Sequence, residues 1–72
     1  MRRYFFDIRE GDELAVDEEG ILLPDIEAAK SLADVVRDRA SANRSRQVTI
    51  EVRDESGAIV AELSLQRPAR RH

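Results

Sequence analysis

Carboxylates are the most concentrated chemically useful groups in this sequence, and they gather in one segment near the N-terminus. The segment contains Asp12, Glu13, Asp17, Glu18 and Glu19. Oxygen ligands of this kind hold calcium when they follow a fixed spacing around a tight turn. The D-x-[DN]-x-[DN]-G order of a calcium loop is absent here. We therefore interpret the segment as a solvated acidic turn and predict no metal site.

Catalytic nucleophiles lack the partners that they need. The sequence contains no cysteine, and its one histidine, His72, is the last residue. A serine nucleophile requires an adjacent base, and no internal histidine is available to supply it. The three glycines are isolated, so they form no phosphate-binding loop. We predict no catalytic or cofactor-binding residue, no cofactor and no small-molecule substrate, and we expect that the protein is not an enzyme.

Alternating apolar residues predict two β-hairpins that would position the remaining side chains. Residues 3–9 alternate, and a shorter strand through Leu14 and Val16 follows the turn at Gly11. Residues 48–53 and 59–65 alternate in the same way on either side of a turn at Gly57. The side chains expected to face the core are Tyr4, Phe6, Ile8, Leu14, Val16, Val48, Ile50, Val52, Ile59, Ala61, Leu63 and Leu65.

Between the hairpins the apolar period changes to that of a helix, from Asp25 to about Asn43, with Asp25 as the N-cap. Residues 21–24 would be a short connector that ends at Pro24. The predicted fold is α+β, in the order ββαββ: a four-stranded antiparallel sheet of two hairpins with one helix on one face. Residues 1–65 would form this single domain, and residues 66–72 a basic, disordered tail.

The sheet face away from the helix is the first candidate binding surface. One helix covers one face only, and antiparallel sheets tolerate a second, wet face. The side chains predicted on that face are Phe5, Asp7, Thr49, Glu51, Arg53, Val60 and Glu62. Phe5 and Val60 are large apolar residues, and a domain of 72 residues has a small core. We therefore expect a non-enzymatic interaction module that self-associates through the open face or an edge strand, as a homodimer, or that binds another cytosolic protein.

Arginines in the second half of the chain give the alternative, which is binding of nucleic acid. The candidate phosphate contacts are Arg44 and Arg46 before the third strand and Arg67, Arg70 and Arg71 after the fourth. Two features weigh against this alternative. The net charge is −3, and Phe5 is the one aromatic residue predicted to be available for base stacking.

Apolar runs are too short to cross a bilayer, which takes about 20 residues. The first residues also lack the apolar core of a signal peptide. We therefore expect a cytoplasmic protein without a membrane segment.

Three blocks of the sequence resemble a family of short, uncharacterised alphaproteobacterial proteins, a domain of unknown function. The blocks are Tyr4-Phe5-Phe6-Asp7-Ile8-Arg9, then Asp17-Glu18-Glu19-Gly20 with Leu23-Pro24-Asp25, and Val48-Thr49-Ile50-Glu51-Val52-Arg53-Asp54. The resemblance extends to Leu65 and leaves out the basic tail. It implies a bacterial, cytosolic origin, and it supplies no activity, cofactor or catalytic residue.

Overall fold

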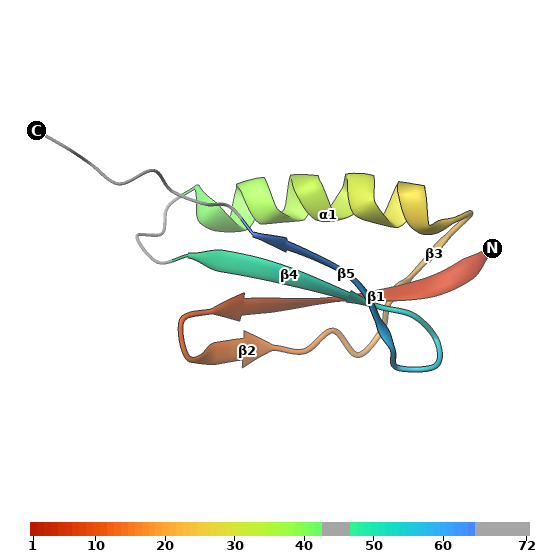
Figure 1. Cartoon of the computed structure of the whole chain (residues 1–72), viewed down its shortest axis with the longest axis horizontal. Helices are drawn as coiled ribbons and strands as arrows, with labels where there is room; N and C mark the ends of the chain where they lie inside the picture. Colours follow the sequence, from red (N-terminus) through yellow and green to blue (C-terminus); the bar gives the residue numbers. More distant parts are fainter. Residues whose placement is uncertain (43–46, 65–72) are drawn as a thin grey trace, which may run out of the picture.

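One helix lies along one face of an antiparallel sheet in the computed structural model, which describes residues 1–42 and 47–64 (Figure 1). The elements in chain order are β1 (Arg2–Glu10), β2 (Glu13–Ala15), β3 (Ile21–Leu23), α1 (Ile26–Ser41), β4 (Val48–Arg53) and β5 (Ile59–Ser64). The α+β class, the single helix and the antiparallel pairing are therefore confirmed. Leu65 and the tail 66–72 lie outside the described residues, as do Arg44 and Arg46.

The sheet differs from the prediction by one strand. Its order is β2-β1-β4-β5, and β3 pairs with the first residues of β1, so the described part of the chain has five strands instead of four. Residues 21–23, which we expected to be a connector, form β3 opposite Arg2, Arg3 and Tyr4. Pro24 favours extended geometry in the residue before it, which suits a strand. Three residues are too few for alternation to reveal that strand in the sequence.

The helix begins where the sequence predicts. Asp25 is the N-cap, with an extended backbone at φ −160°, and its Oδ1 accepts a hydrogen bond from the backbone N–H of Ala28 at 2.9 Å. The first N–H groups of a helix have no carbonyl acceptor within the helix, and this bond supplies an acceptor to one of them. Ala29 and Ala33 are fully buried, so α1 lies close against the sheet.

The core lies between α1 and the sheet face beneath it. Its buried members are Tyr4, Phe6, Ala29, Ala33, Val48, Ile50 and Val52, and Ile8, Ala61 and Leu63 pack against them in part. The inward positions that we predicted for β1, β4 and the second half of β5 are thereby confirmed. Burial of this apolar surface is the main stabilising term of the fold.

Leu14 and Val16 were expected in the core, and this prediction was wrong, because they are 44% and 53% exposed. In β2, Leu14 lies opposite Arg9, whereas Ala15 lies opposite Ile8. Directly opposed residues share a face of the sheet, so Ala15 faces the helix side and Leu14 faces the other side. A shift of one residue in register exchanges the two faces, and the alternation of so short a strand does not fix its register.

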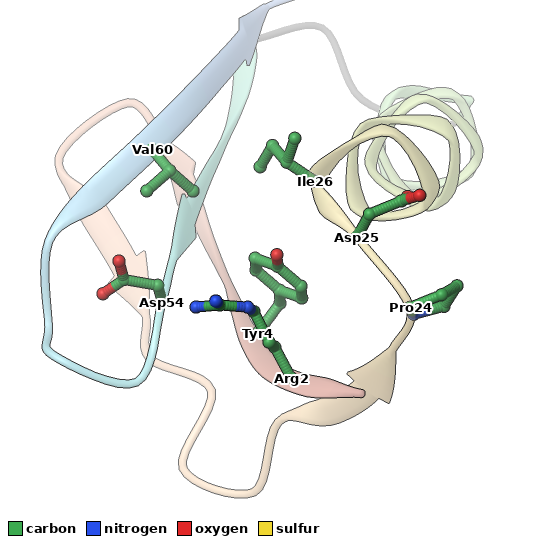
Figure 2. Close-up of a pocket in the computed structure, with 7 residues that line it drawn as sticks. All are labelled: Arg2, Tyr4, Pro24, Asp25, Ile26, Asp54 and Val60. Carbon is green, nitrogen blue, oxygen red and sulfur yellow. The ribbon is translucent and has the colours of Figure 1, made fainter.

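A β-bulge in β5 exchanges two further side chains. Val52 lies opposite Ala61 and Arg53 opposite Ile59, so Val60 is one residue extra. Ile59, which we expected to face the core, is therefore turned away from the helix and is 57% exposed. Val60, which we expected on the open face, instead lines a pocket with Tyr4 (Figure 2). Strict alternation in the sequence gives no sign of a bulge.

Candidate functional site

The face of the sheet turned away from α1, called the outer face below, collects most of the side chains predicted for self-association. Strand pairing arranges them in three rows across the sheet: Phe5, Arg53 and Ile59; Asp7, Glu51 and Glu62; Arg9, Thr49 and Ser64. All the predicted residues except Val60 lie in these rows. Thr49 and Ser64 exchange a hydrogen bond of 2.9 Å between their hydroxyls, and Arg9 pairs with Glu51 at 3.4 Å.

Asp7 is the buried centre of the outer face, with 5% of its surface exposed. Its two carboxylate oxygens accept hydrogen bonds from Arg53, Oδ2 from Nε at 2.7 Å and Oδ1 from Nη2 at 3.1 Å. The backbone N–H of Asp17 donates to the same Oδ1 at 2.9 Å, and Arg53 Nη2 also donates to the carbonyl oxygen of Asp17 at 3.1 Å. Asp7, Asp17 and Arg53, named the Asp7 cluster below, thus join three separate parts of the chain.

Asp17 fastens the segment 17–20 to the sheet with its own carboxylate. Its Oδ2 accepts a hydrogen bond from the backbone N–H of Phe6, and its Oδ1 accepts from Glu19 and Gly20, all at 3.1 Å. An aspartate that accepts bonds from the next residues of its own turn is common in tight turns. Asp17 is therefore partly buried and bonded to the sheet, whereas Asp12, Glu13, Glu18 and Glu19 are exposed, as expected for a solvated acidic turn.

Gly20 lets this segment lie directly on the outer face. Its φ is +72°, and a Cβ built there would be 2.8 Å from Cγ of Arg3 and 2.9 Å from the Phe5 ring. Arg3 donates from Nη1 to the carbonyl oxygen of Glu19 at 2.8 Å, and the Arg53 guanidinium lies 5.0 Å from the centre of the Phe5 ring. The chain itself therefore covers the part of the outer face over β1, which we expected to stay open.

The charges of the Asp7 cluster stabilise one another. The hydrogen bonds from Arg53 lower the pKa of Asp7 below its ordinary value, against the opposite effect of burial, and the same contact raises the pKa of Arg53. Burial by itself would raise the pKa of Asp17, but the backbone N–H groups that donate to its carboxylate outweigh burial, so its pKa is lowered. Both carboxylates are therefore held in the charged form.

This arrangement favours a structural role over a catalytic one. A general acid or base must reach the proton of a substrate and titrate near the working pH. The Asp7 oxygens are already occupied by Arg53 and by the chain, and the carboxylates of the cluster have lowered pKa values. The signal in the sequence was Asp7 within an aromatic strand, together with an aspartate three residues before a glycine, and we read neither as a buried contact.

A pocket of about 490 Å³ lies between the start of α1 and the β4–β5 hairpin (Figure 2). It is lined by Arg2, Tyr4, Pro24, Asp25, Ile26, Asp54 and Val60. The Tyr4 side chain forms part of its floor, and the hydroxyl points towards the gap between Ile26 and Val60 (Figure 2). The sequence did not reveal this pocket, because the bulge that turns Val60 towards it is invisible in the alternation.

The carboxylate of Asp54 belongs to the hairpin turn beside this pocket. Its Oδ1 accepts from the backbone N–H of Ser56 at 2.9 Å, from the Ser56 hydroxyl at 2.6 Å and from the N–H of Ala58 at 3.1 Å. The hydroxyl of Ser56 is the main cause that lowers the pKa of Asp54. Oδ1 of this carboxylate is therefore committed to the turn, whereas Oδ2 accepts no hydrogen bond from a described residue.

Comparison with known proteins places the chain in a family. The model of a domain of unknown function, DUF6894, matches residues 3–66. The chain belongs to the DUF6894 family. This agrees with the resemblance to a domain of unknown function. No curated protein and no solved structure matches the chain.

The DUF6894 match spans the Asp7 cluster and, apart from Arg2, the whole lining of the pocket. Within residues 1–42 and 47–64 of this DUF6894 chain, no group of three or more acidic or histidine side chains is placed to hold a metal ion. No helix in the same ranges has the length and apolar character needed to cross a membrane. Arg44, Arg46, Arg67, Arg70 and Arg71, the candidate nucleic-acid contacts, lie outside the described residues.

Proposed function

We propose that this DUF6894 domain is a non-enzymatic interaction module that self-associates through the outer edge of β5. The observation that carries the proposal is the position of this strand. β5 has six residues and pairs with β4 on one side, and it pairs with no other strand of the described chain. A strand edge of this kind presents backbone N–H and C=O groups to which a second strand can bond.

The composition of β5 suits pairing with another strand. The strand reads Ile-Val-Ala-Glu-Leu-Ser, with Glu62 as its one charged residue and no proline or lysine. Proline and lysine are the residues that commonly protect an edge from a partner. The opposite edge of the sheet is a weaker candidate, because β2 has three residues only.

The edge is favoured over the outer face, the other route that the sequence left open. The segment 17–20 already covers the face over β1 through the Asp7 cluster. The middle row of the face carries three acids, Asp7, Glu51 and Glu62. Two of these acids are already in ion pairs, Asp7 with Arg53 and Glu51 with Arg9, and packing a second copy on the face would remove water from those charges, which is costly.

A second copy joined along β5 meets neither obstacle. Antiparallel pairing of the two β5 strands about a two-fold axis gives one continuous sheet with both helices on the same side. In the register in which Leu63 opposes its own copy, Glu62 opposes Ser64 instead of another acid, and the two Leu63 side chains meet on the helix side of the sheet. The association therefore adds backbone hydrogen bonds and apolar burial without opposing charges.

Sedimentation equilibrium on the full chain and two proline variants tests the proposal. In an antiparallel pair the N–H groups of successive residues point alternately to the two sides of a strand, so one of Ala61 and Glu62 directs its N–H away from β4. Ala61→Pro and Glu62→Pro therefore have different effects. Proline at the residue whose N–H points away from β4 removes no hydrogen bond within the sheet, so that variant keeps the fold. We expect the wild type to sediment at twice 8.2 kDa at high micromolar concentration and the folded variant at 8.2 kDa. A wild type that stays at 8.2 kDa, or a folded proline variant that still dimerises, contradicts the proposal.

A further inference from the structure

We propose that the pocket between α1 and the β4–β5 hairpin binds a small amphiphilic carboxylate, a short apolar body that ends in one carboxylate group. The inference is independent of self-association, because the pocket uses the helix side of the sheet and the proposed dimer uses the edge of β5. Three properties of the lining carry it: an unused hydroxyl, apolar walls and one uncommitted charge.

The unused hydroxyl belongs to Tyr4. This residue is 5% exposed, and its hydroxyl points into the pocket (Figure 2). The hydroxyl has no hydrogen-bond partner among the described residues, and it is not one of the fully buried polar atoms, so the pocket exposes it to water. A hydrogen-bond acceptor on a bound molecule would accept from this hydroxyl.

Apolar side chains form the walls on either side of the Tyr4 hydroxyl. Ile26 begins the helix on one side, and Val60 projects from the bulge on the other (Figure 2). Pro24 also belongs to the lining. The volume, about 490 Å³, lies within the range of pockets that take small organic molecules. This lining suits an apolar body of the size of one aromatic ring with a short chain.

The uncommitted charge is that of Arg2. Two carboxylates share the lining: Asp25 caps the helix through the N–H of Ala28, and Asp54 is bonded to Ser56 through Oδ1 and lies on the side towards which the Arg2 guanidinium extends (Figure 2). The Arg2 guanidinium forms no ion pair or side-chain hydrogen bond with any residue that the structure describes. Guanidinium groups bind carboxylates with two parallel hydrogen bonds, so the ligand that fits this lining carries a carboxylate.

Titration of the ¹⁵N-labelled full chain with 3-phenylpropionate tests this inference by NMR. We expect saturable shifts of the Tyr4, Ile26 and Val60 amide signals. Two control ligands separate the contributions: 3-phenylpropan-1-ol keeps the apolar body without the charge, and acetate keeps the charge without the body. We expect the alcohol to bind about tenfold more weakly, the factor that loss of one charge-assisted contact produces. Acetate should also bind at least about tenfold more weakly, because it loses the apolar burial.

Two variants assign the contacts. Arg2→Gln removes the charge at an exposed position, so the fold persists, and affinity for the acid should fall about tenfold, to the level of the alcohol. Tyr4→Phe should weaken binding several-fold. Arg9→Gln, an arginine of the outer face, is the matched control and should leave binding unchanged. The inference is overturned if the acid gives no saturable shift, if the alcohol binds as well as the acid, or if Arg2→Gln has no more effect than Arg9→Gln.

Discussion

Replacement of Asp7 by asparagine tests the structural role of the Asp7 cluster. Asparagine has almost the same shape as aspartate, but it carries no charge, and one of its two polar atoms is a donor. Arg53 would then face a donor in place of one of the two oxygens that it now contacts at 2.7 and 3.1 Å. The guanidinium would keep its partly buried position without its counter-charge. We therefore expect the variant to fold with a lower free energy of unfolding.

The size of the effect follows from burial. Removal of one partner from a fully buried ion pair costs about 3–5 kcal/mol. The Arg53 side chain is 25% exposed, so water recovers part of this cost, and we expect a loss of about 2–3 kcal/mol. A domain of this length has a total of about 4–11 kcal/mol, so the variant remains folded at 25 °C. The melting temperature should fall by about 8–24 °C.

Glu51→Gln is the matched control. Glu51 is the neighbour of Asp7 in the same row, but its partner Arg9 is 46% exposed and contacts it once, at 3.4 Å. A single long contact with an exposed arginine contributes less than about 1 kcal/mol, although the Glu51 side chain itself is 12% exposed. Urea denaturation followed by far-UV circular dichroism measures both variants against the wild type. Losses that agree within about 0.5 kcal/mol would refute the reasoning, because they would show that burial of Asp7 adds nothing.

Three further predictions use the same assay. Because the pKa values of Asp7 and Asp17 are lower in the folded protein than in the unfolded chain, the unfolded chain takes up protons at a higher pH. The stabilisation from these carboxylates should be fully present above about pH 5 and should be lost as the pH falls through and below 4. Asp7→Asn should make this loss smaller, and an equal dependence on pH in both proteins would contradict the role given to Asp7. Gly20→Ala should cost more than Gly57→Ala, since both glycines have positive φ but only the first is crowded; equal losses would show that segment 17–20 does not lie on the sheet. Ile50→Ala should cost about 2–5 kcal/mol and Ile59→Ala about 0.5 kcal/mol, and a large loss at Ile59 would contradict the bulge.

The architecture could be predicted where local pattern and burial agree. The helix and its cap followed from Asp25 and the apolar period, and the central strands followed from strict alternation around Ile50. These elements are long, and each buries one face, so their sequence records their environment. Strands of three residues and the bulge at Val60 escaped, because neither produces a periodic signal.

The sequence predicted which residues lie on the outer face, but it did not predict the contacts that these residues make. Alternation alone assigned Phe5, Asp7 and Arg53 to one face. It could not show that segment 17–20 folds back over them, because that contact depends on an aspartate turn and on a glycine without a Cβ. The pocket at Tyr4 was equally hidden, since it arises from elements that are distant in sequence.

The most direct test of self-association through β5 is an isotope-filtered NOE experiment on a mixture of labelled and unlabelled chains at high micromolar concentration. Such an experiment detects only contacts between two copies. We predict intermolecular NOEs that join the backbone of residues 62–64 in one copy to the same residues in the other. Intermolecular NOEs confined to the outer face, or the absence of any, would contradict the account.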